Sequence, residues 1–190
     1  MSNPLSGVCF DPGWVSKSVD IPIELYESTL GKYFIGYADN LILGNGTNAW
    51  ARLYNPPCSG VNLHVNVWTV TDISGVPMRA QFWFNAVPPG IPEDSPLVTP
   101  ANTALSPLPI PKVRVQLASS VSGDPQGGVK AFVRRCEPEV TLVETENGKL
   151  IFPPGGNFLV FLSLAENPLS TAHGRVAFGW WEEPLAAIAG

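Results

Sequence analysis

Hydrophobic and polar positions alternate with a period of two along most of the chain. The clearest stretch is 61–70, VNLHVNVWTV, in which valine or leucine takes the first four odd positions. Successive side chains of a strand point to opposite faces, so this stretch predicts a strand with one buried face. Further strands are predicted from similar patterns at 32–37, 40–44, 49–54, 79–85, 112–117, 129–134 and 174–181.

Two stretches predict strands of a different kind. Residues 140–152 contain Asn147-Gly148, the preferred pair for a type I′ turn, and this pair predicts a β-hairpin. Residues 157–164, NFLVFLSL, show no polar alternation over their middle. They are therefore expected to form a central strand that is covered on both faces.

Two other stretches lack a clear strand pattern. Residues 88–111 contain eight prolines, and a loop of that length is usually functional or packed on something. We interpret it as an extended crossing between two sheets; the alternative is a surface loop that engages a partner. Residues 21–30 are the one helix candidate, although Pro22 and two isoleucines weigh against it.

These patterns predict an all-β fold. We expect an antiparallel two-sheet β-sandwich over residues 21–190, with a jelly roll as its connectivity, after an extended N-terminal arm over residues 1–20. In an extended arm Val8 and Phe10 share one side and Cys9 faces the other. We expect Val8, Phe10 and Trp14 to dock the arm on a neighbouring subunit.

The charge composition suggests a partner. Charged residues make up 14% of the chain, against about 25% in an ordinary soluble domain. A surface so poor in charge is expected to be covered by other protein, here further copies of the same chain. The net charge of −5 disfavours nucleic acid, because phosphate binding needs clustered lysine and arginine.

The N-terminal stretch MSNPLSGVCF has neither the charged region nor the apolar core of a signal peptide. No stretch approaches the ~18 apolar residues of a membrane span. We therefore expect synthesis in the cytoplasm and no membrane span, with a spore or cell surface reached after lysis.

The three cysteines, Cys9, Cys58 and Cys136, cannot all pair within one chain. Either all three are reduced, as cytosolic thiols usually are, or at least one pairs with another subunit. All three are therefore candidates for an inter-subunit cross-link.

No legible catalytic or metal-binding motif is present. The two histidines, His64 and His173, are far apart in sequence, and neither a Cys-x-x-Cys pair nor a Gly-x-Ser-x-Gly elbow occurs. We expect no enzyme, no metal and no cofactor.

Three tryptophans, Trp50, Trp68 and Trp83, fall on the strand faces opposite the predicted core. We expect them to form a second core layer or a subunit interface. The alternative is an aromatic platform that binds carbohydrate.

The chain contains the stretches YFIGYADNLILGNGTNAWARLYNPP, GVNLHVNVWTV, IFPPGGNFLVFL and RVAFGWWEE. Through these stretches it resembles a family of small uncharacterised proteins from spore-forming Gram-positive bacteria. The layout of a cysteine-bearing arm before a β-sandwich is similar to that of bacterial endospore appendage subunits. That resemblance implies jelly-roll subunits that stack by sheet augmentation and are cross-linked through their N-terminal connectors. It also implies Cys9 as the connector thiol, with Cys58 or Cys136 as its acceptor.

Taken together, these features predict a structural, self-assembling subunit of a fibre or surface layer, joined by arm exchange or β-augmentation. The alternatives are a carbohydrate-binding module that uses the three tryptophans, and a closed trimer like the globular heads of bacterial collagen-like or tumour-necrosis-factor-like proteins.

Overall fold

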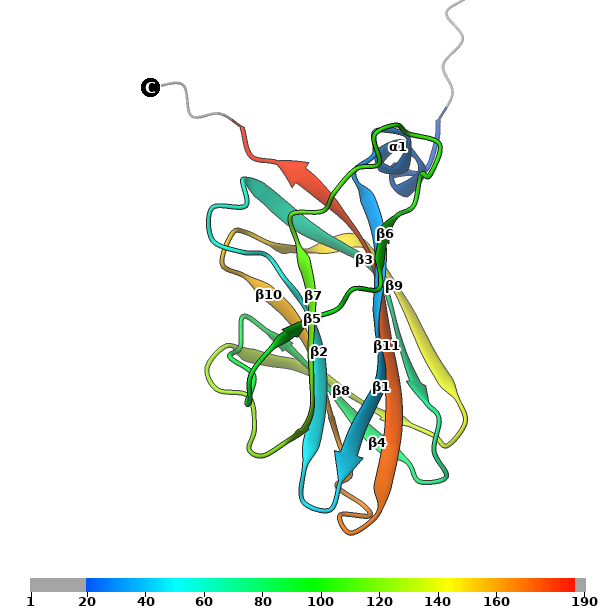
Figure 1. Cartoon of the computed structure of the whole chain (residues 1–190), viewed down its shortest axis with the longest axis vertical. Coiled ribbons are helices and arrows are strands. Elements are labelled where there is room, and N and C mark those ends of the chain that lie inside the picture. Colours follow the sequence, from blue (N-terminus) through cyan, green and yellow to red (C-terminus); the bar gives the residue numbers. More distant parts are fainter. Residues whose placement is uncertain (1–19, 187–190) are drawn as a thin grey trace, which may run out of the picture.

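Eleven strands and one short helix make up residues 20–186, the part of the chain that the computed structural model describes (Figure 1). In chain order they are α1 (Ile23–Thr29), β1 (Tyr33–Gly44), β2 (Asn48–Tyr54), β3 (Val61–Asp72), β4 (Met78–Phe84), β5 (Glu93–Asp94), β6 (Val98–Pro100), β7 (Arg114–Val121), β8 (Val129–Cys136), β9 (Thr141–Phe152), β10 (Asn157–Ser163) and β11 (Thr171–Pro184). The N-terminal arm predicted over residues 1–20 lies outside this part, apart from its last residue.

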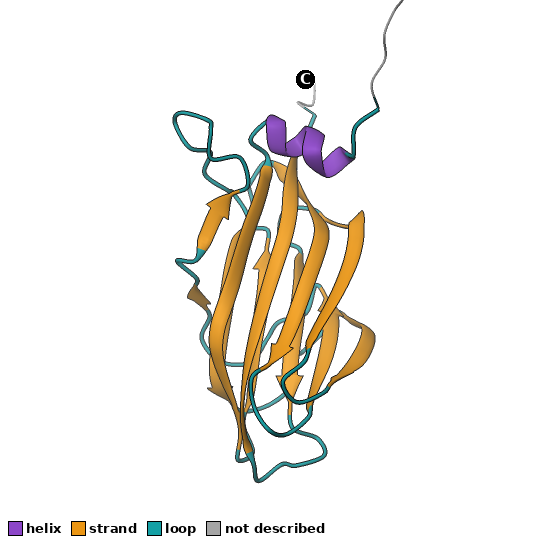
Figure 2. Cartoon of the chain, turned by 90° about the vertical axis from the view of Figure 1, so that its right-hand side faces the viewer, coloured by secondary structure: helices purple, strands orange, loops and turns teal. Residues whose placement is uncertain are grey.

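The strands form two antiparallel sheets packed face to face (Figure 2). One sheet has the order β6-β1-β11-β3-β9 and the other the order β5-β7-β2-β10-β4-β8. Within them, β1-β11-β3-β9 and β2-β10-β4-β8 are the two four-stranded layers of a jelly roll, and the chain passes back and forth between them. The predicted antiparallel β-sandwich is confirmed.

Most of the core lies between the two sheets. Its largest fully buried side chains include Trp68, Trp180, Phe82 and Phe158, and Trp68 packs on Phe82 with ring centroids 4.3 Å apart. Strand β10 is buried on both faces along residues 157–162, as its uninterrupted apolar sequence predicts.

A β-bulge in β3 changes which tryptophan faces the core. The pairing of β3 with β9 shifts between Val65 and Val67. From Val61 to Val65 the odd-numbered residues face inward, but beyond the bulge the inward positions are Trp68 and Val70. The prediction that Trp68 faces away from the core is wrong, because one extra residue reverses every later side chain of a strand.

The hairpin predicted at residues 140–152 is also wrong. These residues form the single strand β9, and both of its halves pair with β3. Asn147 and Gly148 do adopt positive φ angles, of 51° and 71°, but they lie in a four-residue excursion that faces one residue of β3. The pair therefore makes the expected tight bend without reversing the chain.

The two stretches without a clear strand pattern, 21–30 and 88–111, form different structures. The candidate at 21–30 forms α1, which begins after Pro22 and ends at Thr29, with Leu30 as its C-cap. Gly31 follows with a φ of +73°, as is common after a helix C-terminus. Within residues 88–111, β5 pairs with β7 in one sheet and β6 pairs with β1 in the other. This stretch is the predicted crossing between the sheets.

Candidate functional site: the open side of the sandwich

The crossing segment closes one side of the sandwich (Figure 1). Ser95 donates its backbone N–H to the carbonyl of Val115 on β7 (2.8 Å) and its hydroxyl to the carbonyl of Tyr37 on β1 (2.7 Å). The backbone N–H of Tyr37 in turn donates to Leu97 (3.1 Å). Polar groups of β1 and β7 are thus paired on this side, and the two sheets are tied together by hydrogen bonds.

The opposite side is open. It is formed by β8 and β9, the outermost strands of the two sheets, and no other strand of residues 20–186 pairs with their outer edges. They contain 8 and 12 residues. Long unpaired edges are templates for another strand, and monomeric proteins usually shorten or cover them.

The hydrogen-bond register shows which groups of β8 face outward. Asn85 donates its backbone N–H to the carbonyl of Asn157 (2.9 Å), which directly precedes Phe158 of β10. Backbone groups of successive residues in an antiparallel strand point to opposite neighbours. The odd-numbered residues of β4 therefore bond through their backbone to β10, and the even-numbered ones bond to β8. From Met78 to Phe82, before the register shift, the partners of even-numbered β4 residues are even-numbered in β8. The backbone groups of Val133 and Arg135 therefore point to the open edge.

The same reasoning applies to β9. The backbone N–H of Asp72 donates to the carbonyl of Val140 (3.0 Å), so even-numbered residues of this half of β9 bond to β3. Val143 then directs its N–H and C=O outward. Its side chain is 61% exposed, which is unusual for a valine in a strand.

The cations of β8 lie close to the surface of its sheet. Lys130 lies over the ring of Trp83 at 4.8 Å, and Arg134 lies over Phe132 at 5.0 Å. Arg135 donates to the carboxylate of Glu166 at 2.8 Å, and these hydrogen bonds lower the pKa of Glu166 below its usual value. The cationic side chains of β8 are thus held by aromatic rings and by the carboxylate of Glu166 in the same chain.

Exposed apolar side chains gather on α1, at one end of the sandwich (Figure 2). The helix buries none of its residues, and Ile23, Leu25 and Tyr26 are each 45–50% exposed. Residue 20, where the arm joins the described chain, lies directly before this helix. The end of the sandwich that carries α1 therefore presents an exposed apolar surface.

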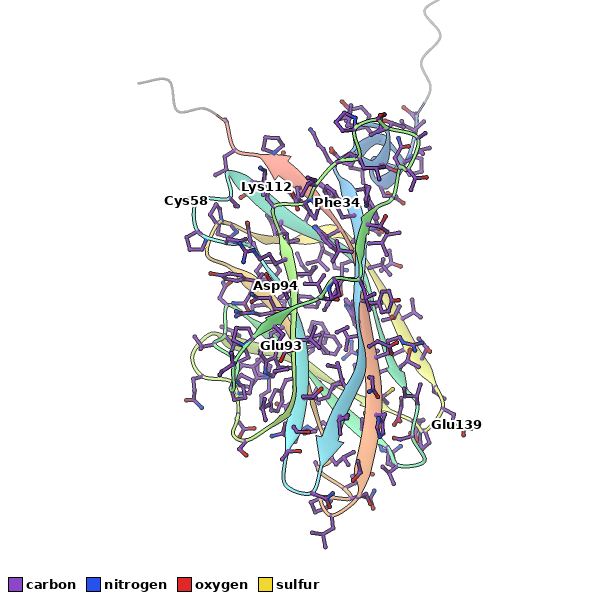
Figure 3. The ribbon with its side chains drawn as sticks, viewed as in Figure 1. Phe34, Cys58, Glu93, Asp94, Lys112 and Glu139 are labelled. Atoms are coloured by element: carbon purple, nitrogen blue, oxygen red, sulfur yellow. The ribbon has the colours of Figure 1, made fainter. Side chains whose placement is uncertain are left out.

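The structure describes two of the three cysteines, and their surroundings differ. Cys58 is exposed in the turn between β2 and β3, with a φ of 66° (Figure 3). Cys136 is buried at the end of β8, and its thiol lies 3.5 Å from the carbonyl oxygen of Val140. Burial within the folded subunit disfavours Cys136 as a cross-link candidate, and its pairing with another subunit stays a prediction. Cys9 lies outside the described residues.

We expect iodoacetamide to modify Cys58 and leave Cys136 unmodified in the folded protein. Burial raises the pKa of the Cys136 thiol, so less of the reactive thiolate forms, and the reagent also lacks access to it. Intact-mass spectrometry of the Cys9→Ser variant should show one adduct under native conditions and two in guanidinium. Two adducts at equal rates under native conditions would contradict the burial of Cys136.

The three tryptophans do not form one platform. Trp68 lies between the sheets, whereas Trp50 and Trp83 lie on the outer face of the sheet that contains β2 and β4. Trp50 is fully buried in a second hydrophobic layer and donates its indole N–H to the carbonyl of Pro89 (2.7 Å). The prediction that all three rings form one platform for carbohydrate is therefore wrong.

Sequence reasoning did not single out Val133 and Val143. Both belong to strands that the alternation predicts, but alternation does not say which strands lie at the edges. Val8, Phe10 and Trp14, the predicted docking residues of the arm, lie outside the described residues.

Within residues 20–186, no three histidine, cysteine or acidic side chains are grouped so that they could hold a metal ion. The single helix in this range is too short to cross a membrane.

One family model matches the chain. It is described as a family of unknown function (DUF6143), and the match covers residues 12–187. No curated protein and no solved structure matches.

Proposed function

Since the chain belongs to this family of unknown function, we propose a function from its own surface: a structural subunit that assembles with copies of itself into a fibre or surface layer. The observation that carries the proposal is the difference between the two sides of the sandwich. One side is tied shut by the crossing segment, and the other presents the open edges of β8 and β9. We propose no catalytic role.

The open edges fit a strand from a neighbouring copy. Val133 and Val143 offer backbone donors and acceptors on two consecutive strands, and such edges are completed by β-augmentation. The donating N-terminal segment and the accepting edge are different surfaces, so a one-way contact between them is heterologous. Heterologous contacts that do not close into a ring produce open filaments.

The N-terminal segment is the strand we propose for this role. Val8 and Phe10 lie 12 and 10 residues before residue 20, the first described residue, so an extended segment can carry them at most roughly 33–43 Å from it. We propose that this reach places them on the edge of an adjacent subunit. The spore surface remains our proposed setting, from the sequence resemblance.

A disulfide between Cys9 of one copy and Cys58 of another would make the contact covalent. Cys58 is the exposed thiol of the described chain, and it lies toward the end of the sandwich that carries α1, where the segment joins (Figure 3). We propose this pair in place of the earlier choice between Cys58 and Cys136. Non-reducing electrophoresis of the Cys58→Ser variant, with Cys136→Ser as the matched control, tests this disulfide separately from the assembly.

The assembly itself is tested by blocking the outward N–H groups. We expect the double variant Val133→Pro/Val143→Pro to stay folded, because proline is tolerated where the N–H of an edge strand faces solvent. We also expect it to lose assembly. Val133→Thr/Val143→Thr retains both N–H groups and a similar shape, and should assemble as the wild type does.

The measurements are light scattering after size exclusion, negative-stain microscopy, and circular dichroism to check folding. A wild type that remains monomeric at every concentration tested would overturn the proposal, as would filaments of unchanged length from the folded proline variant. A closed trimer would give one discrete mass of three subunits, and that result would also overturn the filament.

A further inference from the structure

The outer face of the six-stranded sheet contains a polar cleft of about 350 Å³. Its floor includes Arg79, Gln81 and Trp83, which alternate along β4 with inward-facing residues. Lys130 of β8 and Ser163 of β10 line it from the neighbouring strands, and loops at 44–47, 124 and 164–168 form its walls. The volume falls in the range of small-molecule sites.

Two polar groups in this cleft have no partner in the described chain. The indole N–H of Trp83 is buried and has no hydrogen-bond partner within residues 20–186. Buried polar groups are nearly always hydrogen-bonded, so this unpaired donor beside the cleft indicates a missing partner. Gln81 is 6% exposed, and its side-chain amide makes no hydrogen bond to a described residue, whereas Arg52 and Gln116 on the same face are paired with each other.

The cleft also concentrates positive charge in an acidic protein. Arg79 and Lys130 both line it, and neither forms an ion pair with a described residue, whereas Arg135 and Arg175 bind Glu166 and Asp39. The net charge of the whole chain is −5. Two cations without an ion pair in one cleft favour an anionic ligand.

Other lining groups narrow the class of ligand. Asp124 also lines the cleft, and its carboxylate would repel a doubly charged phosphate but accepts hydrogen bonds from hydroxyl groups. Gln81 and Ser163 can each both donate and accept. A ligand with one carboxylate and several hydroxyls matches this set.

We propose that the cleft binds a sugar acid, a pyranose that carries a single carboxylate. The guanidinium of Arg79 binds the carboxylate, with Lys130 as the second cation, and the planar guanidinium suits two parallel hydrogen bonds to it. The amide of Gln81 and the carboxylate of Asp124 bind ring hydroxyls. This site is separate from the backbone edges that the proposed function uses.

The test is isothermal titration calorimetry of the full chain with D-glucuronate, D-glucose and inorganic phosphate. We expect glucuronate to bind, and glucose, which lacks the carboxylate, to bind at least tenfold more weakly. Phosphate binding equal to or stronger than that of glucuronate would overturn the proposal. Absence of glucuronate binding at millimolar concentrations would do the same.

Two charge variants distinguish binding in the cleft from general electrostatic attraction to the protein. We expect Arg79→Gln to weaken glucuronate binding at least tenfold, because a charge-assisted pair is lost. Arg134→Gln removes an equal charge from β8 without touching the cleft lining and should leave the affinity within twofold of the wild type. Equal losses in both variants would show non-specific attraction and refute the site. Gln81→Leu should also weaken binding, with the fold checked by circular dichroism.

Discussion

Replacing Trp68 with alanine is expected to lower the free energy of unfolding by about 3–5 kcal/mol, the usual cost of deleting a large aromatic side chain from a core. The ring is 1% exposed and packs between the sheets against Phe82. Its indole N–H also donates to the carboxylate of Glu146 (3.1 Å). The variant therefore leaves both a cavity and a buried acid with one partner fewer.

Urea denaturation at a fixed protein concentration measures this loss, since association shifts the apparent stability. Trp68→Phe is the matched control, because it keeps an aromatic ring and much of the volume while it removes the hydrogen bond to Glu146. It should cost about 1–2 kcal/mol. If the alanine and phenylalanine variants were equally stable, Trp68 would not fill the space between the sheets.

The second large effect is expected at Gly148, in the excursion of β9. A Cβ at this position would lie 1.8 Å from the ring of Trp181, and the φ of Gly148 is +71°. Trp181 cannot easily move, because its other contacts include the stacked ring of His64, 5.2 Å away. Gly148→Ala should therefore cost about 2–5 kcal/mol, from overpacking together with the left-handed backbone.

Gly155→Ala separates the two causes. Gly155 has a φ of +88°, and nothing lies within 4 Å of where its Cβ would be. It should cost only about 1–2 kcal/mol, the penalty for a left-handed conformation. Urea denaturation of both variants gives the comparison, and equal losses would mean that Trp181 does not constrain the excursion.

The sequence predicted the strands, the sandwich and the crossing segment because these depend on local alternation and on where prolines gather. It placed Trp50 correctly on the outer face of β2 but Trp68 incorrectly, because a bulge leaves no mark in a run such as VNLHVNVWTV. The Asn147-Gly148 pair also shows that local sequence does not determine which strands pair. Its local conformation follows from residue type, but the strand that each arm pairs with is decided by tertiary packing.

The candidate sites were harder to predict for a related reason. Whether Val133 and Val143 direct their backbone groups to solvent depends on strand order and register, which are long-range properties. For the cleft, a local signal does exist. Two polar side chains and one ring, those of Arg79, Gln81 and Trp83, occupy alternate positions along β4 and so share one face of the strand. That pattern alone does not show that loops enclose it, nor that Lys130 joins from β8.

The position of β11 has a consequence for biosynthesis. The last strand of the sandwich lies between β1 and β3, in the middle of its sheet, and it pairs residues 33–44 with residues 171–184. Until residues 171–184 have been synthesised, the chain lacks this strand, so β1 and β3 are then edges themselves. The sheet can close only after that point, and this non-local pairing is expected to make folding slow. Under the proposed assembly through strand edges, the incomplete chain passes through a stage with more open edges than the folded sandwich has, and nascent copies need to be kept apart.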